Sequence, residues 1–188
     1  MVDAAPAEIL TERLRLRPPR LEDVEAHLEM DRDPEVMRFV EPLPGSPPDL
    51  EAKRRRLLER IESGWPAVGR QFYVAARDGG EFLGWCALFP LEDRAGQPVE
   101  IGYRYRRAAW GRGVATEAAA ALLRFGFETL GLDPIVGVTD HANRGSQAVL
   151  AKVGLRRAGN IRAYGEDVAF FVAHRAGWLA AQSGGSGR

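Results

Sequence analysis

The fold is decided by the stretch RRAAWGRGVATE, residues 106–117, in which a strand-like run ends in a glycine turn and a helix-forming run begins. Residues 99–105 alternate as a half-buried strand, and Ala118, Leu122 and Phe125 recur at helical spacing. Two glycines at such a junction let the backbone approach a ligand and turn several N–H groups toward it, at the positive end of the helix dipole. The sequence therefore predicts a binding site for a diphosphate group at this turn.

Two other phosphate-binding loops also place glycines between a strand and a helix. The dinucleotide fingerprint requires Gly or Ala where this chain has Thr116, and the loop of phosphate-binding NTPases requires a Gly-Lys-Ser/Thr sequence that does not follow here. A tight turn without a ligand is the remaining alternative. The segment NRGSQAVLAKVGL, residues 143–155, follows a strand-like run at 135–139 and argues against that alternative.

Together the two segments resemble the GNAT acetyltransferases. In that superfamily a loop of the form Gln/Arg-x-x-Gly-x-Gly/Ala holds the pyrophosphate of acetyl-CoA, and a later Asn-x-x-Ser helix lines its pantetheine arm. The chain matches at Gly113, Ala115, Asn143 and Ser146, whereas Trp110 stands where the loop usually begins with Gln or Arg.

With Trp110 at this position, the chain resembles the branch of ribosomal-protein N-terminal (alanine) acetyltransferases. Three further segments, residues 11–17, 33–39 and 100–103, also resemble this branch. The resemblance runs from about residue 10 to about residue 175, and it is specific as a set of motifs.

The resemblance implies an α/β GNAT fold, with a mixed, twisted sheet of about seven strands and about four helices, splayed between two strands where acetyl-CoA enters. It implies one domain over residues 8–178, and the tail at 179–188, which is rich in Gly and Ser from Ser183 onward, is expected to be disordered. The residues that it places at the cofactor are Ile101, Tyr103, Trp110, Gly111, Arg112, Gly113, Val114, Ala115, Thr116, Asn143, Ser146 and Lys152.

Acetyl transfer from a thioester to an amine needs a free amine, a polarised carbonyl and a proton for the departing thiolate. Glu100 is the leading candidate for the base because it precedes the strand that lies beside the acetyl group in GNAT proteins. Strand alternation alone also predicts a solvent-facing polar residue there. Ser146 is the candidate proton donor, although it can instead hydrogen-bond the cofactor while water acts, and the helix after Asn143 lacks the tyrosine that many GNAT enzymes use.

The acceptor amine is not specified by any motif. The resemblance implies a groove made by the helices near the N-terminus and the final strand pair, which contain His27, Arg38, Phe39, Trp65, Tyr164 and Glu166. The leading function is acetyl-CoA-dependent N-acetylation of a primary amine, first a protein N-terminus. The alternatives are a small amine, such as an antibiotic, polyamine or amino acid, and a non-catalytic acyl-CoA-binding sensor.

Composition restricts the other function classes. With 188 residues and 45% apolar content, the chain is long enough for one compact core. The net charge of +0 gives no electrostatic reason to expect binding to nucleic acid or to anionic membranes, and the chain shows neither a bilayer-spanning run nor a signal peptide, so a cytoplasmic monomer or homodimer is expected. Cys86, the single cysteine, is expected to be buried, with neither a disulfide nor a metal site.

Local signals predict the remaining elements. Asp33-Pro34 is typical of a helix start, and Asp78-Gly79-Gly80 is typical of a hairpin turn. The proline-rich connector at 41–48 cannot be helical throughout. The expected elements are strands at 12–17, 72–76, 82–88, 99–105, 135–139, 155–160 and 168–173, and helices that include 21–28, 49–62, 118–130 and 144–153.

Overall fold

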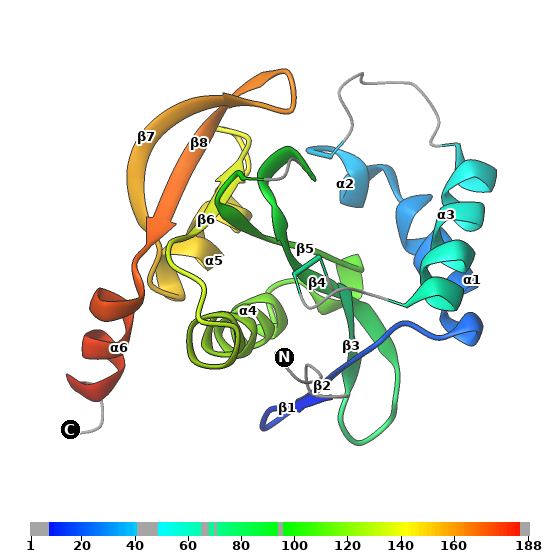
Figure 1. Ribbon diagram of the computed structural model, residues 1–188. Coiled ribbons are helices and arrows are strands. Elements are labelled where there is room, and N and C mark those ends of the chain that lie inside the picture. Colours follow the sequence, from blue (N-terminus) through cyan, green and yellow to red (C-terminus); the bar gives the residue numbers. More distant parts are fainter. Residues whose placement is uncertain (1–7, 41–48, 65–67, 70, 94–95, 185–188) are drawn as a thin grey trace.

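A single mixed sheet organises the computed structural model, which describes residues 8–40, 49–64, 68–69, 71–93 and 96–184 (Figure 1). Within these residues the sheet has eight strands, in the order β1-β2-β3-β4-β5-β6-β8-β7. Every neighbouring pair is antiparallel except β5 and β6, which are parallel. The strands are β1 (Ile9–Leu10), β2 (Leu14–Arg17), β3 (Gln71–Ala76), β4 (Phe82–Pro90), β5 (Val99–Tyr105), β6 (Ile135–Thr139), β7 (Arg156–Ala163) and β8 (Glu166–Ala173).

Helices cover both faces of this sheet. Helices α1 (Val24–Asp31), α2 (Pro34–Met37) and α3 (Leu50–Ser63) lie on one side, whereas α4 (Val114–Arg124) and α5 (Arg144–Lys152) lie on the other (Figure 1). Helix α6 (Arg175–Gly184) follows the last strand. The longer elements are connected by the 3₁₀ helices η1 (Leu21–Asp23), η2 (Leu91–Asp93) and η3 (Arg107–Ala109) and by the π-helix η4 (Phe125–Thr129), which continues α4. Among the described residues, none of the helices is both long and apolar enough to cross a membrane.

Alternation along the central strands divides the interior into two layers. Apolar side chains on the α4 side form the main core, which includes Phe72, Val74, Cys86, Leu88, Ile101, Ala118 and Leu122. The opposite face carries Tyr73, Trp85 and Arg104, of which Tyr73 and Trp85 pack with Met30 and Val36 beneath α1 and α2. The buried position expected for Cys86 is confirmed.

The sheet opens between β5 and β6. Strand β5 pairs with β4 along its whole length, from Val99 to Tyr105. With β6 it pairs only at Val99–Ile135 and Glu100–Val136, so the two strands diverge directly after Glu100. This divergence is the splay that the sequence predicted, and α4 begins at the far end of β5.

The sheet and the helices extend further toward the ends of the chain than the sequence predicted. The sheet gains an eighth strand because Ile9 and Leu10 pair with Leu16 and Arg15. The described part has six α-helices, where about four were expected. The short α2 begins at Pro34 after the N-cap Asp33, as the sequence predicted, whereas the C-terminal α6 was not expected.

The prediction of a disordered tail is wrong for residues 179–184, which belong to α6. The physical reason is Trp178, which is 5% exposed, packs against the ring of Phe127 and donates from Nε1 to the Val153 carbonyl at 2.9 Å. Residues 185–188 and the connector at 41–48 lie outside the described residues.

Candidate active site

The glycine turn between β5 and α4 has the backbone of an anion site. Gly111 and Gly113 have φ values of 70° and 77°, in the left-handed region that favours glycine, and Gly113 is the N-cap of α4. The first N–H groups of an α-helix have no partner within the helix and carry its positive dipole end, so those of Val114, Ala115 and Thr116 suit a negatively charged group.

An arginine from the N-terminal segment lies across this turn. Arg13 donates from Nε to Glu117 Oε2 at 2.7 Å and from Nη1 to the Arg112 carbonyl at 3.0 Å, while Thr11 donates to Glu117 Oε1 at 2.5 Å. Burial raises the pKa of Glu117, but the hydrogen bonds from Thr11 and Arg13 bring it below its ordinary value. The carboxylate in the first turn of α4 is thus neutralised locally. The sequence did not indicate this role of Arg13, because neither its strand-like run nor the resemblance of residues 11–17 points to α4.

The opening after Glu100 is bordered by a contact between β5 and α5. The Tyr103 hydroxyl lies 3.2 Å from both the carbonyl and the Oγ of Ser146. Asn143 caps α5 by accepting from the Ser146 N–H at 3.0 Å. Burial raises the pKa of Tyr103 to about 12, so its phenol keeps its proton at neutral pH. The structure therefore brings Tyr103, Asn143 and Ser146 together at one point, beside the buried Ile101.

Three other predicted cofactor residues occupy less central positions. Trp110 is 48% exposed and donates from Nε1 to the Tyr105 carbonyl at 2.8 Å, which holds its ring next to the turn. Arg112 is exposed and lies in the turn itself. Lys152 lies in the last turn of α5, at the opposite end from Asn143, so the structure does not group it with the others.

Glu100 is buried at the point where β5 and β6 separate. It is only 5% exposed, so the alternative of a solvent-facing residue is wrong, while its role as the base remains a prediction. The cause is the β7–β8 hairpin, whose Tyr164 hydroxyl donates to Glu100 Oε2 at 2.7 Å.

Of the residues expected to line the acceptor groove, one is buried in the core and others are exposed. His27 is 2% exposed, with Nδ1 2.5 Å from the Tyr73 hydroxyl, so it is a core residue. Phe39 is 37% exposed beneath the Arg38 guanidinium, and Glu166 is exposed at the start of β8. Trp65 lies outside the described residues.

A buried charge cluster that the sequence did not indicate lies beneath these helices. The Asp31 side chain is fully buried, accepts from Arg104 Nη1 at 2.7 Å, forms an ion pair with Lys53 Nζ and lies 3.2 Å from His27 Nε2. Burial raises the pKa of Asp31, but the hydrogen bond from His27 and the charges of Arg104 and Lys53 hold it far below its ordinary value. Burial lowers the pKa of His27 below its ordinary 6.5.

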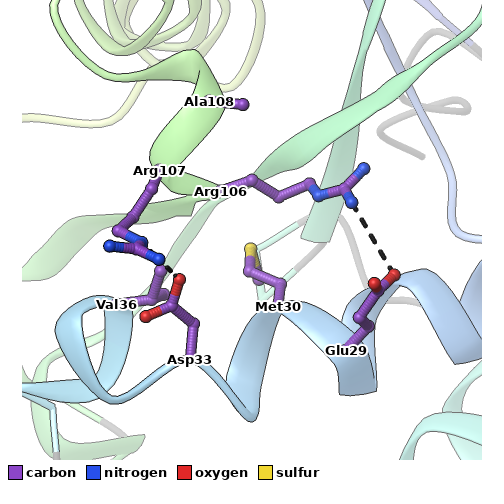
Figure 2. Close-up of a pocket in the computed structure, with 7 residues that line it drawn as sticks. All are labelled: Glu29, Met30, Asp33, Val36, Arg106, Arg107 and Ala108. Atoms are coloured by element: carbon purple, nitrogen blue, oxygen red, sulfur yellow. Dashed lines mark hydrogen bonds and ion pairs between the residues drawn. The ribbon is translucent and has the colours of Figure 1, made fainter.

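Two further ion pairs tie the same end of α1 to the residues that lead into the glycine turn (Figure 2). Arg107 Nε donates to Asp33 Oδ2 at 2.6 Å, and Arg106 Nη2 lies 3.7 Å from Glu29 Oε2. These four residues surround a cavity of about 250 Å³, which Met30, Val36 and Ala108 also line. With the Asp31–Arg104 contact, α1 and the start of α2 are attached at three points to the chain that carries the predicted cofactor loop. Because α1 and α2 belong to the predicted acceptor groove, they are called the acceptor-side helices.

Comparison with known proteins decides the family. Residues 13–156 match the family model described as an acetyltransferase (GNAT) domain. The chain belongs to the GNAT family. This GNAT protein is 30% identical over 176 residues to the uncharacterized protein YkkB of Bacillus subtilis, covering 89% of this chain and 95% of the relative. It is 33% identical over 151 residues to an FsC-acetyl coenzyme A-N(2)-transacetylase of Aspergillus fumigatus, covering 77% of this chain and 63% of that relative.

Solved structures share the same GNAT fold. A GNAT-family acetyltransferase from Bacillus anthracis superposes with a TM-score of 0.75 at 24% identity, covering 90% of this chain and 99% of that one. A structure described as a putative ribosomal-protein-serine acetyltransferase from Vibrio cholerae has a TM-score of 0.67 at 22% identity, covering 89% and 97%. Spermidine N-acetyltransferase from Vibrio cholerae, in complex with CoA and spermine, has a TM-score of 0.71 at 16% identity, covering 90% and 99%. The GNAT protein described here is an acetyl-CoA-dependent N-acetyltransferase.

Proposed function

We propose that this enzyme transfers the acetyl group of acetyl-CoA to the α-amine of a protein N-terminus. The observation that carries the proposal is Glu100, a carboxylate buried where β5 and β6 diverge, at the end of the opening that Tyr103 and Ser146 border. A base at this place can accept a proton from an amine that approaches from the side of the predicted acceptor groove. The fold shared with a putative ribosomal-protein-serine acetyltransferase supports a protein N-terminus as acceptor.

The glycine turn is the proposed site of the cofactor diphosphate. When bound, acetyl-CoA supplies the acetyl group as a thioester. The backbone N–H groups from Gly111 to Ala115 hold the diphosphate, with help from Arg112 and Thr116. The residues proposed to line the rest of the cofactor are Ile101, Tyr103, Trp110, Val114, Asn143 and Ser146.

Two proton transfers accompany the reaction. Glu100 takes the proton that the amine loses as its nitrogen bonds to the carbonyl carbon, either directly or through water. Ser146 supplies the proton that the sulfur gains when the C–S bond breaks. Tyr103 supports this step because its protonated phenol lies within hydrogen-bond distance of Ser146 Oγ.

The test compares two carboxylates. Replacing Glu100 by Gln should lower turnover by about 10²-fold or more, because losing a general base typically costs 10²–10⁴, and should leave the affinity for acetyl-CoA unchanged. Glu166→Gln is the matched control, since this exposed carboxylate belongs to the β7–β8 hairpin, whose Tyr164 contacts Glu100. Full turnover in Glu100→Gln together with a large loss in Glu166→Gln would transfer the role of base to Glu166.

A second candidate acceptor is a polyamine, favoured by the fold shared with spermidine N-acetyltransferase. Release of free thiol is measured with peptides that begin with Ala or Ser, with spermine, with an amine antibiotic and with free amino acids. We expect the highest kcat/KM for a peptide, and a higher value for spermine would favour the small-amine enzyme. A protein that binds acetyl-CoA but releases no thiol with any of these amines favours the sensor.

A further inference from the structure

The tip of the β7–β8 hairpin is fastened to the turn after β4 by a reciprocal pair of hydrogen bonds. The Tyr164 N–H donates to Glu92 Oε1 at 2.8 Å, and the Glu92 N–H donates to the Tyr164 hydroxyl at 3.0 Å. The two residues are 72 positions apart in the sequence. The resemblance implied a place for Tyr164 in the acceptor groove, but nothing in the sequence of its turn indicates these partners.

Both residues adopt a backbone conformation that is unfavourable for them. Glu92 and Tyr164 have φ values of 56° and 54°, in the left-handed region that residues other than glycine rarely adopt. Such conformations persist where the surrounding contacts require them, and they cluster at functional sites. The Tyr164 ring is 46% exposed, so burial of the ring does not explain its position. The hydroxyl contacts do.

The direction of the Tyr164 proton follows from the contacts of its hydroxyl with Glu92 and Glu100. A phenol has one proton to donate. Because the Glu92 N–H is a donor, the Tyr164 oxygen accepts there, and its own proton is directed to Glu100 Oε2 at 2.7 Å. A hydrogen bond donated to a carboxylate stabilises its ionised form and is stronger than one between neutral groups. The contact therefore both orients the Glu100 carboxylate and favours its charged state.

We propose that Tyr164 is a positioning residue that holds Glu100 ionised and in one orientation at the divergence of β5 and β6. Glu92 completes the arrangement, because its N–H fixes which way the Tyr164 proton points. The functional value of this arrangement rests on the proposed role of Glu100 as the base. A base must be deprotonated before the amine arrives, and this hydrogen bond extends the pH range in which it is.

The experiment follows the Glu100 carboxyl directly. In protein labelled with ¹³C at glutamate side chains, the Glu100 signal is identified by its loss in Glu100→Gln, and its titration is recorded in the wild type and in Tyr164→Phe. Removing the hydroxyl keeps the ring and should move the titration of Glu100 to higher pH by about one unit. The acid limb of the kcat/KM profile should move in the same direction, while the KM for acetyl-CoA stays constant.

Arg162→Ala is the matched control, because Arg162 donates to the Gly165 carbonyl within the same hairpin and its substitution changes neither Tyr164 nor Glu100. It should leave the titration of Glu100 at the wild-type pH. A shift of equal size in Arg162→Ala would overturn the proposal, since loosening of the hairpin would then be the cause. An unchanged titration in Tyr164→Phe would overturn it as well.

The two proposals fail in different ways. If the titration shifts in Tyr164→Phe but Glu100→Gln keeps full turnover, Tyr164 positions the carboxylate and Glu100 is not the base. If Glu100→Gln loses turnover but Tyr164→Phe titrates as the wild type does, Glu100 remains the base and the role of Tyr164 is refuted.

Discussion

At the scale of single residues, the two glycines of the cofactor loop meet different surroundings. A Cβ atom on Gly111 would meet nothing within 4 Å, whereas one on Gly113 would lie 3.2 Å from Arg13 Nη2. Both residues have left-handed backbones, so a side chain is strained at either. Only at Gly113, however, does an added side chain also press on the arginine that lies across the turn.

We expect Gly113→Val to bind CoA much more weakly than the wild type. A β-branched residue cannot easily take the φ of Gly113, and its methyl groups would crowd Arg13 and the N-terminus of α4. Isothermal titration calorimetry measures the change, with Gly79→Val as the control because Gly79 has open space and no left-handed φ. Equal CoA affinity in Gly113→Val and in the wild type would show that this turn is not the diphosphate site.

At the scale of elements, β5 separates two tasks onto its two faces. Ile101 and Tyr103 point to the α4 and α5 side, whereas Arg104 points to the acceptor-side helices and Glu100 lies beneath the β7–β8 hairpin. Alternation in the sequence predicted this strand and accounted for a polar residue at position 100. The partners of these side chains were not predictable, because Tyr164 is 64 positions from Glu100 and comes to it only through the tertiary fold. The resemblance likewise grouped Lys152 with Ser146 at the cofactor, but the helix places them at different ends.

The contact between the N-terminal segment and α4 is expected to support the cofactor loop. Arg13 holds Glu117 and the Arg112 carbonyl at once, so its loss frees a carboxylate beside the proposed diphosphate site. Arg13→Ala should therefore raise the KM for acetyl-CoA about tenfold, and the double variant Arg13→Ala/Glu117→Gln should recover part of that loss. Steady-state kinetics on Arg13→Ala, Glu117→Gln and the double variant measures the coupling. Strictly additive effects would show that the pair does not act on the loop.

At the scale of the whole molecule, the acceptor-side helices are attached through charge. Asp31 binds Arg104. Asp33 binds Arg107, and Glu29 lies near Arg106 (Figure 2). The C-terminal end of α1 therefore lies along the segment that leads from β5 to the glycine turn. The sequence predicted the family, the strands that form the sheet and the splay. It did not predict this attachment, because charged residues on a helix are usually solvated and their burial depends on how layers pack.

The buried cluster makes stability depend on pH. Because burial lowers the pKa of His27 below 6.5 in the folded state, the unfolded chain takes up its proton first as the pH falls. The stabilisation is complete above pH 6.5 and declines below it, by at most about 1.4 kcal/mol per pH unit for one proton. The lowered pKa of Asp31 adds a further loss below its ordinary value of 3.8.

Urea unfolding at pH 7.5 and pH 5 tests this dependence. His27→Gln should lower stability at pH 7.5 but should flatten the decline between the two pH values, because the titrating group is gone. The exposed His141 and His174 remain in both proteins, so their contributions to the pH dependence of stability cancel in the comparison. An identical decline in the variant and the wild type would assign the pH dependence to other groups.

The narrow seam between β5 and β6 also suggests how the protein can be divided. Only the pairs Val99–Ile135 and Glu100–Val136 join the strands on either side of it, and the exposed Gly131 lies in the connection that crosses from one part to the other. A chain cut at Gly131 yields one fragment with the glycine turn and another with Asn143 and Ser146. If a cofactor bridges both, its concentration sets how much of the two fragments reassembles. The enzyme then becomes a complementation sensor whose signal reports acyl-CoA inside a cell.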